Sequence, residues 1–269
     1  MKMRKTGIKA YEILKRVRKA SPLVHHMTNW VTIYDCANIV KVVGASPVMA
    51  HAPEEAAEMA RMASSLVLNI GTLTTDMIAA MKKAAAAANR RKIPVLLDVC
   101  GAGATRLRDK SCFELLKKVR IDIIKGNASE IARISGEDVR TKGVDSSEVR
   151  NDMVELIKTL ASSRKCTIVM TGREDIISDG TKVFTVKNGH EMMSRIVGTG
   201  CMAASLIGTF SAVEKDLAYA AASALTCFGV SGELAARSSS GPASFKTALF
   251  DRMYSLDQGA VTALQRVYS

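Results

Sequence analysis

One stretch of the chain decides its fold: residues 66–98 read LVLNIGTLTTDMIAAMKKAAAAANRRKIPVLLD. It contains a β-rich run at 66–70, a helical pattern from about 74 to 90, and a second β-rich run at 93–98. Pro94 stands near the start of the second run, where a missing backbone donor is tolerated. Apolar strands separated by helices are typical of a parallel sheet that is covered by helices on both faces.

The same alternation continues towards the C-terminus. Helical patterns lie at 107–119, from about 128 onward, and at 146–162. Between them, β-rich runs lie at 121–124 and 166–170. These segments predict further parallel strands of the same α/β sheet, each joined to the next by a helix.

Residues 175–186 depart from this pattern. Two short β-like runs meet there at Asp179-Gly180, a pair that favours a tight two-residue hairpin. We therefore predict an antiparallel edge on the mostly parallel sheet. After Cys201 the chain is predicted to be helical nearly to its end, with an interruption at 238–242.

Composition limits the class of protein. The chain has 269 residues, 48% of them hydrophobic, which suits one α/β domain over residues 1–269. The formal net charge is +12, but the first twenty residues alone contain eight Lys or Arg and a single acid, Glu12. Helical spacing over 10–20 predicts an amphipathic helix with a basic outer face. Aromatic residues are only 4% of the chain, so we interpret this face as solvated and expect no nucleic-acid or membrane partner.

The sequence favours a soluble cytoplasmic protein. Its first residues contain no apolar signal segment, and the longest uncharged run, at 196–213, is too polar for a membrane span. Six cysteines without a CxxC pair suit reduced thiols rather than disulfides or zinc. Four histidines offer no metal-ligand spacing.

Ligands of open α/β sheets bind beyond the carboxyl ends of the strands, so the residues there are the first candidates for a site. Glycines, small hydroxyls and acids gather at these ends, which suits a polyphosphate and its cation. The segments are 69–72, 98–105, 125–130 and 171–175. Asp98 and Glu130 are predicted to lie near Mg²⁺, directly or through water. The structural alternatives are a helix-capping Asp98 and a surface Glu130 in a first helical turn.

The strongest local signal is Gly198-Thr199-Gly200-Cys201, which leads into a helix of small residues. Glycines let successive backbone N–H groups converge, and a helix N-terminus adds partial positive charge. We therefore predict that Gly198, Thr199 and Gly200 form an anion site for a phosphoryl group. The alternative is a plain loop before a helix with an inert buried cysteine. Neither GxxxxGK[ST] nor a complete dinucleotide-binding glycine loop occurs in the chain.

Six short motifs, taken together in their order, resemble the hydroxyethylthiazole kinase family of the ribokinase-like superfamily. The motifs are PLVHHMTN (22–29), GASPVMA (44–50), LNIGTL (68–73), GNASEI (126–131), NGH (188–190) and GTGC (198–201). The resemblance implies a ribokinase-like three-layer α/β sandwich. It also implies Mg²⁺-dependent transfer of the ATP γ-phosphoryl group to the hydroxyl of 4-methyl-5-(2-hydroxyethyl)thiazole in thiamin salvage, by a homotrimer with sites between subunits.

The resemblance also assigns roles to individual residues. It places Met49, Gly198 and Asn29 at thiazole-binding positions, Lys125, Thr171 and Asn127 at ATP-binding positions, and Asp98 and Glu130 near magnesium. Cys201 falls where related sugar kinases usually have an Asp base, and we expect its thiol to orient the alcohol. Phosphoryl transfer has a loose transition state, so positioning and charge stabilisation can replace a strong base.

Two positions depart from the pattern of the family. The family usually has Pro-Val where this chain has Val99-Cys100, so the loop after Asp98 lacks the rigidity of a proline. It also usually has Arg where this chain has Lys125, which keeps the charge but not the bidentate fork. We expect the ATP site to survive with a changed affinity.

Other functions stay open from the residues alone. A hydroxymethylpyrimidine-type kinase, or an ATP-dependent dehydratase of hydrated nicotinamide nucleotides, shares the predicted fold and usually carries Asp at the position of Cys201. A non-catalytic nucleic-acid-binding protein is a remote alternative that only the charge of +12 favours.

Overall fold

The computed structural model describes residues 4–136 and 147–269, and nine strands of these residues form one sheet. The strands are β1 (Leu23–Met27), β2 (Ser46–Val48), β3 (Ser65–Asn69), β4 (Val95–Asp98), β5 (Ile123–Asn127), β6 (Thr167–Thr171), β7 (Asp175–Ser178), β8 (Val183–Val186) and β9 (Val267–Tyr268). Their order is β2-β1-β3-β4-β5-β6-β7-β8-β9. The first six strands in this order are parallel, and β7, β8 and β9 each run antiparallel to the strand before them.

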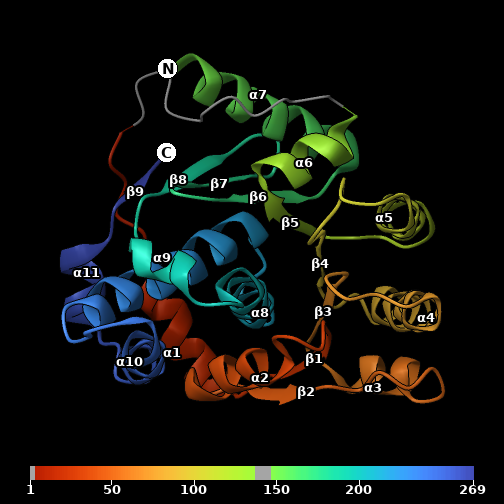
Figure 1. Cartoon of the computed structure of the whole chain (residues 1–269), viewed down its shortest axis with the longest axis horizontal. Coiled ribbons are helices and arrows are strands. Elements are labelled where there is room, and N and C mark those ends of the chain that lie inside the picture. Colours follow the sequence, from red (N-terminus) through yellow and green to blue (C-terminus); the bar gives the residue numbers. More distant parts are fainter. Residues whose placement is uncertain (1–3, 137–146) are drawn as a thin grey trace.

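Helices cover both faces of the sheet (Figure 1). One face carries α1 (Ala10–Ala20), α2 (Ile33–Val42), α8 (Thr199–Ser211), α9 (Leu217–Ala236), α10 (Pro242–Tyr254) and α11 (Gln258–Leu264). The other face carries α3 (Ala56–Met62), α4 (Thr75–Arg91), α5 (Arg106–Lys118), α6 (Ala128–Ser135) and α7 (Ser147–Arg164). A short 3₁₀ helix, η1 (Glu191–Arg195), precedes α8. The predicted three-layer α/β sandwich with an antiparallel edge is confirmed.

Each face of the sheet has its own apolar core. In β3, Val67 enters the core formed with α8 and α9, whereas Leu66 and Leu68 enter the core formed with α4. Successive side chains of a strand point to opposite faces, so a strand that is covered on both sides must be apolar throughout. This requirement explains the three consecutive apolar residues at 66–68.

Helix α9 is the central helix of its layer. By length and composition it is the one helix of the described residues that could cross a membrane, but 78% of its apolar window is buried inside the protein. It packs against α1, α8 and α10 and against the sheet. The burial of its sides by these neighbours accounts for its apolar composition.

The predicted amphipathic helix at the N-terminus is confirmed as α1. Its apolar face is buried through Ala10, Ile13, Leu14 and Val17. Two basic side chains of its outer face make structural contacts, because Arg16 pairs with Glu214 and the Arg18 guanidinium donates to backbone carbonyls at the end of α10 and beyond it. Some of the basic side chains of this helix therefore stabilise the fold through contacts within the protein.

Several boundaries differ from the predictions, and the largest differences are in β5 and in the hairpin. The predicted strand at 121–124 lies later, at Ile123–Asn127, because the Asp122 carboxylate accepts a hydrogen bond from the Val95 backbone before the strand begins. The hairpin has a four-residue loop, 179–182, rather than a two-residue turn. The Asp179 carboxylate accepts hydrogen bonds from backbone N–H groups within this loop at 2.7 and 2.9 Å, which stabilises the longer connection.

Several elements were not predicted from the sequence. They are β1, β2, β9, α2 and α3. Both β2 and β9 have at most three residues and form only by pairing with a neighbour that is distant in the sequence. The predicted start of α7 at Ser146 lies outside the described residues, and the helix is described from Ser147 onward.

Candidate active site

Four neighbouring strands carry polar residues at their carboxyl ends. The register of the parallel pairs places Asn69 beside Asp98 and Asp98 beside Lys125. Further along the same edge, Asn127 stands beside Thr171. Because the strands are parallel, all these residues lie at one end of the sheet, where α/β proteins bind their ligands.

Asp98 and Lys125 form a buried ion pair at this edge. Lys125 Nζ lies 3.2 Å from Asp98 Oδ2, and the two residues are 5% and 0% exposed. Burial raises the pKa of Asp98 to about 7, although the Lys125 ammonium counteracts part of this effect. Burial alone would lower the pKa of Lys125, but the carboxylates of Asp98 and Glu130 raise it above its ordinary value. Lys125 therefore carries a positive charge in the protein interior.

Asn69 connects this ion pair to the helix that starts nearby. Its amide Nδ2 donates to Asp98 Oδ2 at 2.9 Å and to Cys201 Sγ at 3.4 Å. Its Oδ1 accepts from the Gly71 backbone at 2.8 Å and from Asn29 Nδ2 at 3.2 Å. These four partners fix the side-chain amide of Asn69. Asn69 in turn holds Asp98 of β4 and Cys201 of α8 in fixed positions relative to each other.

Cys201 lies in the first turn of α8 and is almost completely buried. Asn29 Nδ2 donates to its sulfur at 3.2 Å. A hydrogen bond from the Cys100 thiol lowers the pKa of Cys201 to about 5 against the effect of burial, and Thr32 and Asn29 contribute further donors. The same thiol–thiol hydrogen bond raises the pKa of Cys100. The thiol of Cys201 therefore ionises more readily than an ordinary cysteine.

The backbone before Cys201 needs its glycines. Gly198 caps α8 with φ of 97°, in the left-handed region, and an added Cβ would lie 2.8 Å from Thr32 Cγ2. An added Cβ at Gly200 would lie 3.3 Å from Lys125 Nζ. The first N–H groups of a helix have no partner within the helix. The start of α8 therefore combines backbone donors, the helix dipole and the Lys125 charge, all of which favour an anion.

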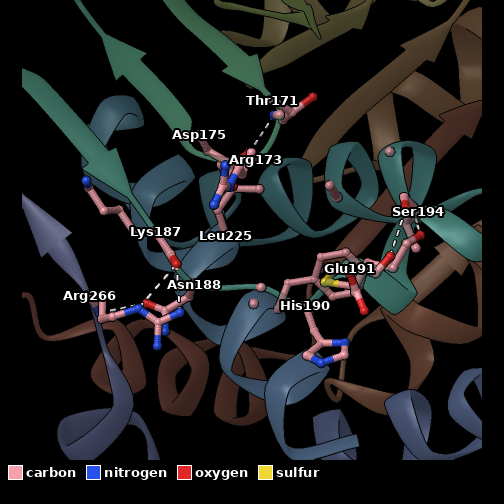
Figure 2. A pocket seen from close by; sticks show the side chains of 18 residues that line it. Thr171, Arg173, Asp175, Lys187, Asn188, His190, Glu191, Ser194, Leu225 and Arg266 are labelled. Carbon is pink, nitrogen blue, oxygen red and sulfur yellow. Dashed lines mark hydrogen bonds between the residues drawn. The ribbon is translucent and has the colours of Figure 1, made fainter. Parts of the chain in front are cut away.

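A cavity of about 850 Å³ adjoins the start of α8 (Figure 2). Thr199 and Gly200 of the predicted anion site form part of its wall, and so does Thr171 at the end of β6. Ala203, Leu225 and Phe228 supply an apolar side.

Charged and polar groups line the rest of this cavity. Figure 2 shows Thr171 and Asp175 on the strand side, with Glu191 and Ser194 of η1 on another wall. Asp175 Oδ1 accepts a hydrogen bond from the Gly172 backbone at 3.1 Å, and burial raises the pKa of Asp175 to about 7. Arg173, Lys187 and Arg266 also line the cavity, so an elongated molecule with an apolar ring at one end and anionic groups near these cations matches its walls.

The two remaining predicted site residues of β5 and α6 stabilise the backbone. Asn127 and Glu130 form a capping box: Asn127 Oδ1 accepts from the Glu130 backbone at 2.9 Å, and Glu130 Oε2 accepts from the Asn127 backbone at 2.7 Å. Glu130 Oε1 also accepts from the Gly101 backbone at 2.7 Å. Glu130 is therefore buried and fully engaged, rather than a surface residue.

The Asp98 carboxylate has one buried oxygen, Oδ1, without a protein partner. Within residues 4–136 and 147–269, no three His, Cys, Asp or Glu side chains gather into a closed metal cluster. Magnesium usually keeps several waters and binds through one or two carboxylates together with phosphate oxygens. The orphaned oxygen of Asp98 fits such an ion, which would take its other ligands from water and a polyphosphate.

The structure separates the predicted residues into three groups. Asn29, Asp98, Lys125, Gly200 and Cys201 are linked by the contacts above. Thr171 faces the cavity, with its hydroxyl 3.4 Å from the Gly126 carbonyl, and Asn127 stands beside it. Met49 follows β2, and its carbonyl lies 3.1 Å from His51 Nδ1. The ring of His51 packs on Trp30, next to Asn29 in the chain, with centroids 4.9 Å apart.

Three residues of the cluster were not predicted. Asn69 lies within a segment that was singled out, but its role depends on the register of β3 and β4. Thr32 donates to Asn29 Oδ1 at 3.1 Å and precedes α2, which was not predicted. Cys100 was noticed only as a departure from the family pattern. The pairing of its thiol with Cys201 has no signal in the sequence, since the two residues are far apart in the chain.

Comparisons with known proteins identify the relatives of this chain. The model of the "Hydroxyethylthiazole kinase family" matches residues 14–259. A relative named "Hydroxyethylthiazole kinase" from Methanosarcina mazei is 56% identical over 254 residues, which cover 94% of this chain and 97% of the relative. The solved structure of a hydroxyethylthiazole kinase protein from Pyrococcus horikoshii has a TM-score of 0.90 and 39% identity, and covers 97% of this chain and 98% of that one.

A more distant structure shows the fold alone. A ribokinase-like superfamily protein from Enterococcus faecalis has a TM-score of 0.63 and 13% identity, and the match covers 94% of this chain and 100% of that one. The predicted ribokinase-like architecture is thereby confirmed.

Proposed function

The chain belongs to the hydroxyethylthiazole kinase family, and from this premise we propose that it phosphorylates the hydroxyl of 4-methyl-5-(2-hydroxyethyl)thiazole with ATP in thiamin salvage. Relatives that are 46–56% identical over most of the chain carry this name, which favours the thiazole over a pyrimidine acceptor or a dehydratase. The proposal rests on the position of Gly200, which borders both the 850 Å³ cavity and the Lys125 ammonium. A nucleotide in the cavity would direct its phosphates to the Asp98–Lys125–Cys201 cluster.

ATP occupies the cavity in this proposal. Its base packs against Leu225 and Phe228, and its phosphates extend along the wall formed by Thr171 and Gly200. Lys125 supplies a buried positive charge beside the terminal phosphate. Asn127, at the end of β5 beside Thr171, completes the proposed ATP contacts.

Mg²⁺ neutralises charge on the phosphates when it is bound. Asp98 is the proposed ligand, because its Oδ1 is buried and has no protein partner. Glu130 lies in the same region but accepts backbone hydrogen bonds with both oxygens, so its proposed contact with the ion runs through water. Phosphate oxygens and water would supply the ligands that the protein does not.

The acceptor alcohol binds on the other side of the start of α8, near Gly198, Asn29 and Met49. Its hydroxyl oxygen forms a bond to the γ-phosphorus, and the bond between that phosphorus and the bridging oxygen of ADP breaks. The proton of the hydroxyl passes to Cys201, whose sulfur Asn29 and Asn69 orient. The N–H groups of Gly198, Thr199 and Gly200 stabilise the transferring phosphoryl group.

We also propose a cytoplasmic homotrimer in which residues 1–269 form one catalytic domain. One sheet takes strands from both ends of the chain, which supports the single domain. Trp30, Val31, Tyr34 and Val197 are 58–78% exposed and flank Asn29 and Gly198 along the chain. Exposed apolar side chains of this size are typical of contact surfaces, so a neighbouring subunit covers them beside the alcohol site.

Product identification tests the proposed reaction. Purified protein is incubated with ATP and Mg²⁺ together with hydroxyethylthiazole, hydroxymethylpyrimidine or no alcohol, and products are identified by mass. We expect phosphorylated thiazole. Turnover with the pyrimidine alone would show that the chain phosphorylates a different acceptor. The absence of turnover with either alcohol would contradict the kinase assignment. Parallel assays test the two alternative functions, which are ATP-dependent dehydration of a hydrated nicotinamide nucleotide and binding of RNA over a series of salt concentrations.

A further inference from the structure

The NGH motif at 188–190 has no part in the proposed reaction, although it lines the cavity beside α8. Gly189 and His190 also line a second, neighbouring cavity of about 390 Å³. The motif is therefore a wall between two open spaces. Close packing cannot hold such a wall, because the second cavity leaves room for it to shift away from a bound molecule.

The carboxylate of Glu233 holds this wall. Glu233 Oε1 accepts hydrogen bonds from Asn188 Nδ2 and from the Gly189 backbone, both at 2.9 Å. Glu233 belongs to α9 and lines the second cavity. Within the described residues, the wall of the first cavity includes the motif but not Glu233. An effect of Glu233 on a molecule in the first cavity must therefore pass through the residues that it holds.

Arg266, close to the C-terminus, fixes the Glu233 carboxylate. Its guanidinium forms a bidentate pair, with Nη2 2.7 Å from Oε1 and Nη1 3.2 Å from Oε2. Nη2 also donates to the Lys187 carbonyl at 2.8 Å, and the Arg266 backbone donates to Asn188 Oδ1 at 2.7 Å. Figure 2 shows Arg266, Lys187 and Asn188 joined on one side of the cavity. A bidentate arginine–carboxylate pair fixes geometry as well as charge.

Further contacts complete the support of Asn188, which is 6% exposed. Its Nδ2 donates to the Leu264 carbonyl at 2.8 Å. The backbone of Asn188 also lies directly on α9, because an added Cβ at Gly229 would be 2.6 Å from it. Three segments that are distant in the sequence thus meet at this residue: the NGH motif, α9 and the residues before the C-terminus.

We propose that Glu233 and Arg266 are positioning residues for the nucleotide, which hold the NGH motif as a rigid wall of the ATP cavity. This proposal rests on the proposed function, since it takes ATP as the occupant of that cavity. A wall that is fixed before binding lowers the ordering cost of binding and so raises affinity. The transfer step depends on Asp98 and Cys201 instead, so loss of the support should weaken ATP binding and leave kcat unchanged.

Calorimetric titration with AMP-PNP and Mg²⁺ measures this binding without turnover. Glu233→Ala removes the acceptor of both bonds to the motif and should raise the Kd by about 10-fold. Glu233→Gln keeps an acceptor oxygen and should recover most of the affinity. Glu214→Ala is the matched control, because Glu214 pairs with Arg16 at 2.7 Å away from both cavities. It should leave the Kd unchanged.

Steady-state kinetics separate positioning from a general loss of structure. For Glu233→Ala we expect a raised KM for ATP, with kcat and the KM for the alcohol unchanged. A role in stability alone would lower Tm and the fraction of folded protein but not change the Kd of the folded fraction. An unchanged Kd in Glu233→Ala, or an equal rise in Glu214→Ala, would overturn the proposal.

Arg266 needs a separate test, because it lines the cavity itself. If it acts through the motif, Arg266→Met combined with Glu233→Ala should weaken AMP-PNP binding no more than the stronger single substitution. Additive losses, or a loss in Arg266→Met alone, would show direct contact with the nucleotide and overturn its positioning role. If the unchanged protein bound no AMP-PNP, the proposed ATP site would fail, and this proposal with it.

Discussion

The ammonium of Lys125 lies 3.2 Å from Oδ2 of Asp98, and neither side chain is more than 6% exposed. A Cβ at Gly200 would lie 3.3 Å from the same ammonium. One buried cation thus faces both the acid proposed to hold Mg²⁺ and the helix turn proposed to hold the phosphoryl group. Removal of a charge from such a pair leaves its partner buried and uncompensated.

Lys125→Met should therefore impair both folding and ATP use. Above about pH 7, where Asp98 is ionised, we expect a loss of about 3–5 kcal/mol in the free energy of unfolding, the cost of breaking a buried ion pair. We also expect a raised KM for ATP. Urea unfolding and initial-rate kinetics measure the two effects. Lys125→Arg is the matched control, since it keeps the charge and is usual in the family. An unchanged KM in the Met variant would contradict the placement of ATP.

Asp98 should make stability depend on pH. Its pKa is raised from 3.8 to about 7 in the folded protein, so between about pH 4 and pH 7 the folded state binds its proton more tightly than the unfolded state. Stability from this group is therefore present at low pH and is lost as pH rises through the window. Each pKa unit corresponds to about 1.4 kcal/mol, which makes the change a few kcal/mol.

Asp98→Asn tests this prediction, because it cannot ionise. Relative to the unchanged protein, the variant should gain stability as pH rises from about 4 to 7. Urea unfolding at a series of pH values, without Mg²⁺ and ATP, measures the difference. Asp109→Asn is the control: hydrogen bonds from Arg133 lower the pKa of Asp109, so its removal cannot produce a gain with rising pH. Parallel curves for Asp98→Asn and the unchanged protein would refute the assignment.

Cys201→Asp should keep kinase activity. A carboxylate at this position can accept the same hydrogen bonds from Asn29 and Asn69 and can take the proton of the alcohol. Cys201→Ala should lower kcat by at most about 100-fold, since a positioned proton acceptor contributes about 10²–10⁴-fold and a loose transition state favours the lower end. Steady-state kinetics at saturating ATP measure both variants. A folded, ATP-binding but inactive Asp variant would count against the role of Cys201.

Gly198→Ala should weaken the anion site. The left-handed φ of 97° costs an alanine about 1–2 kcal/mol, and its Cβ would press on Thr32 at 2.8 Å. The first turn of α8 must shift, so we expect a lower kcat/KM together with a modest fall in Tm. Gly7→Ala is a suitable control, because an added Cβ there has no neighbour within 4 Å. Equal effects of the two substitutions would argue against a specific role of Gly198.

The sequence predicted the parallel strands well where burial on both faces demands apolar runs, as in β3, β4 and β6. It failed where an element exists only through its partner. β2 pairs three residues with β1, and β9 pairs two residues with β8, which is too short for a periodic pattern. The Asp179-Gly180 pair predicted a hairpin correctly but not its loop, because the Asp179 side chain stabilises two further residues.

The candidate site shows the same limit. Asp98 and Cys201 could be singled out from a strand end and from the start of a helix. Asn69 could not be distinguished from its neighbours, because its four hydrogen bonds come from four different segments. Glu130 is the acid that the motif predicts. The local sequence does not reveal that both of its carboxylate oxygens accept hydrogen bonds from backbone N–H groups.

Asn69, Asp98 and Lys125 lie on three adjacent strands, and this placement has a consequence for how a misfolded preparation of the protein can be recognised. A slip of one residue in any of these pairings would turn a polar group to the opposite face of the sheet. The misaligned chain would bury much the same apolar area, so a measurement of compactness would hardly detect the error. Catalytic turnover would detect it at once, and specific activity therefore reports strand alignment in a preparation of this protein.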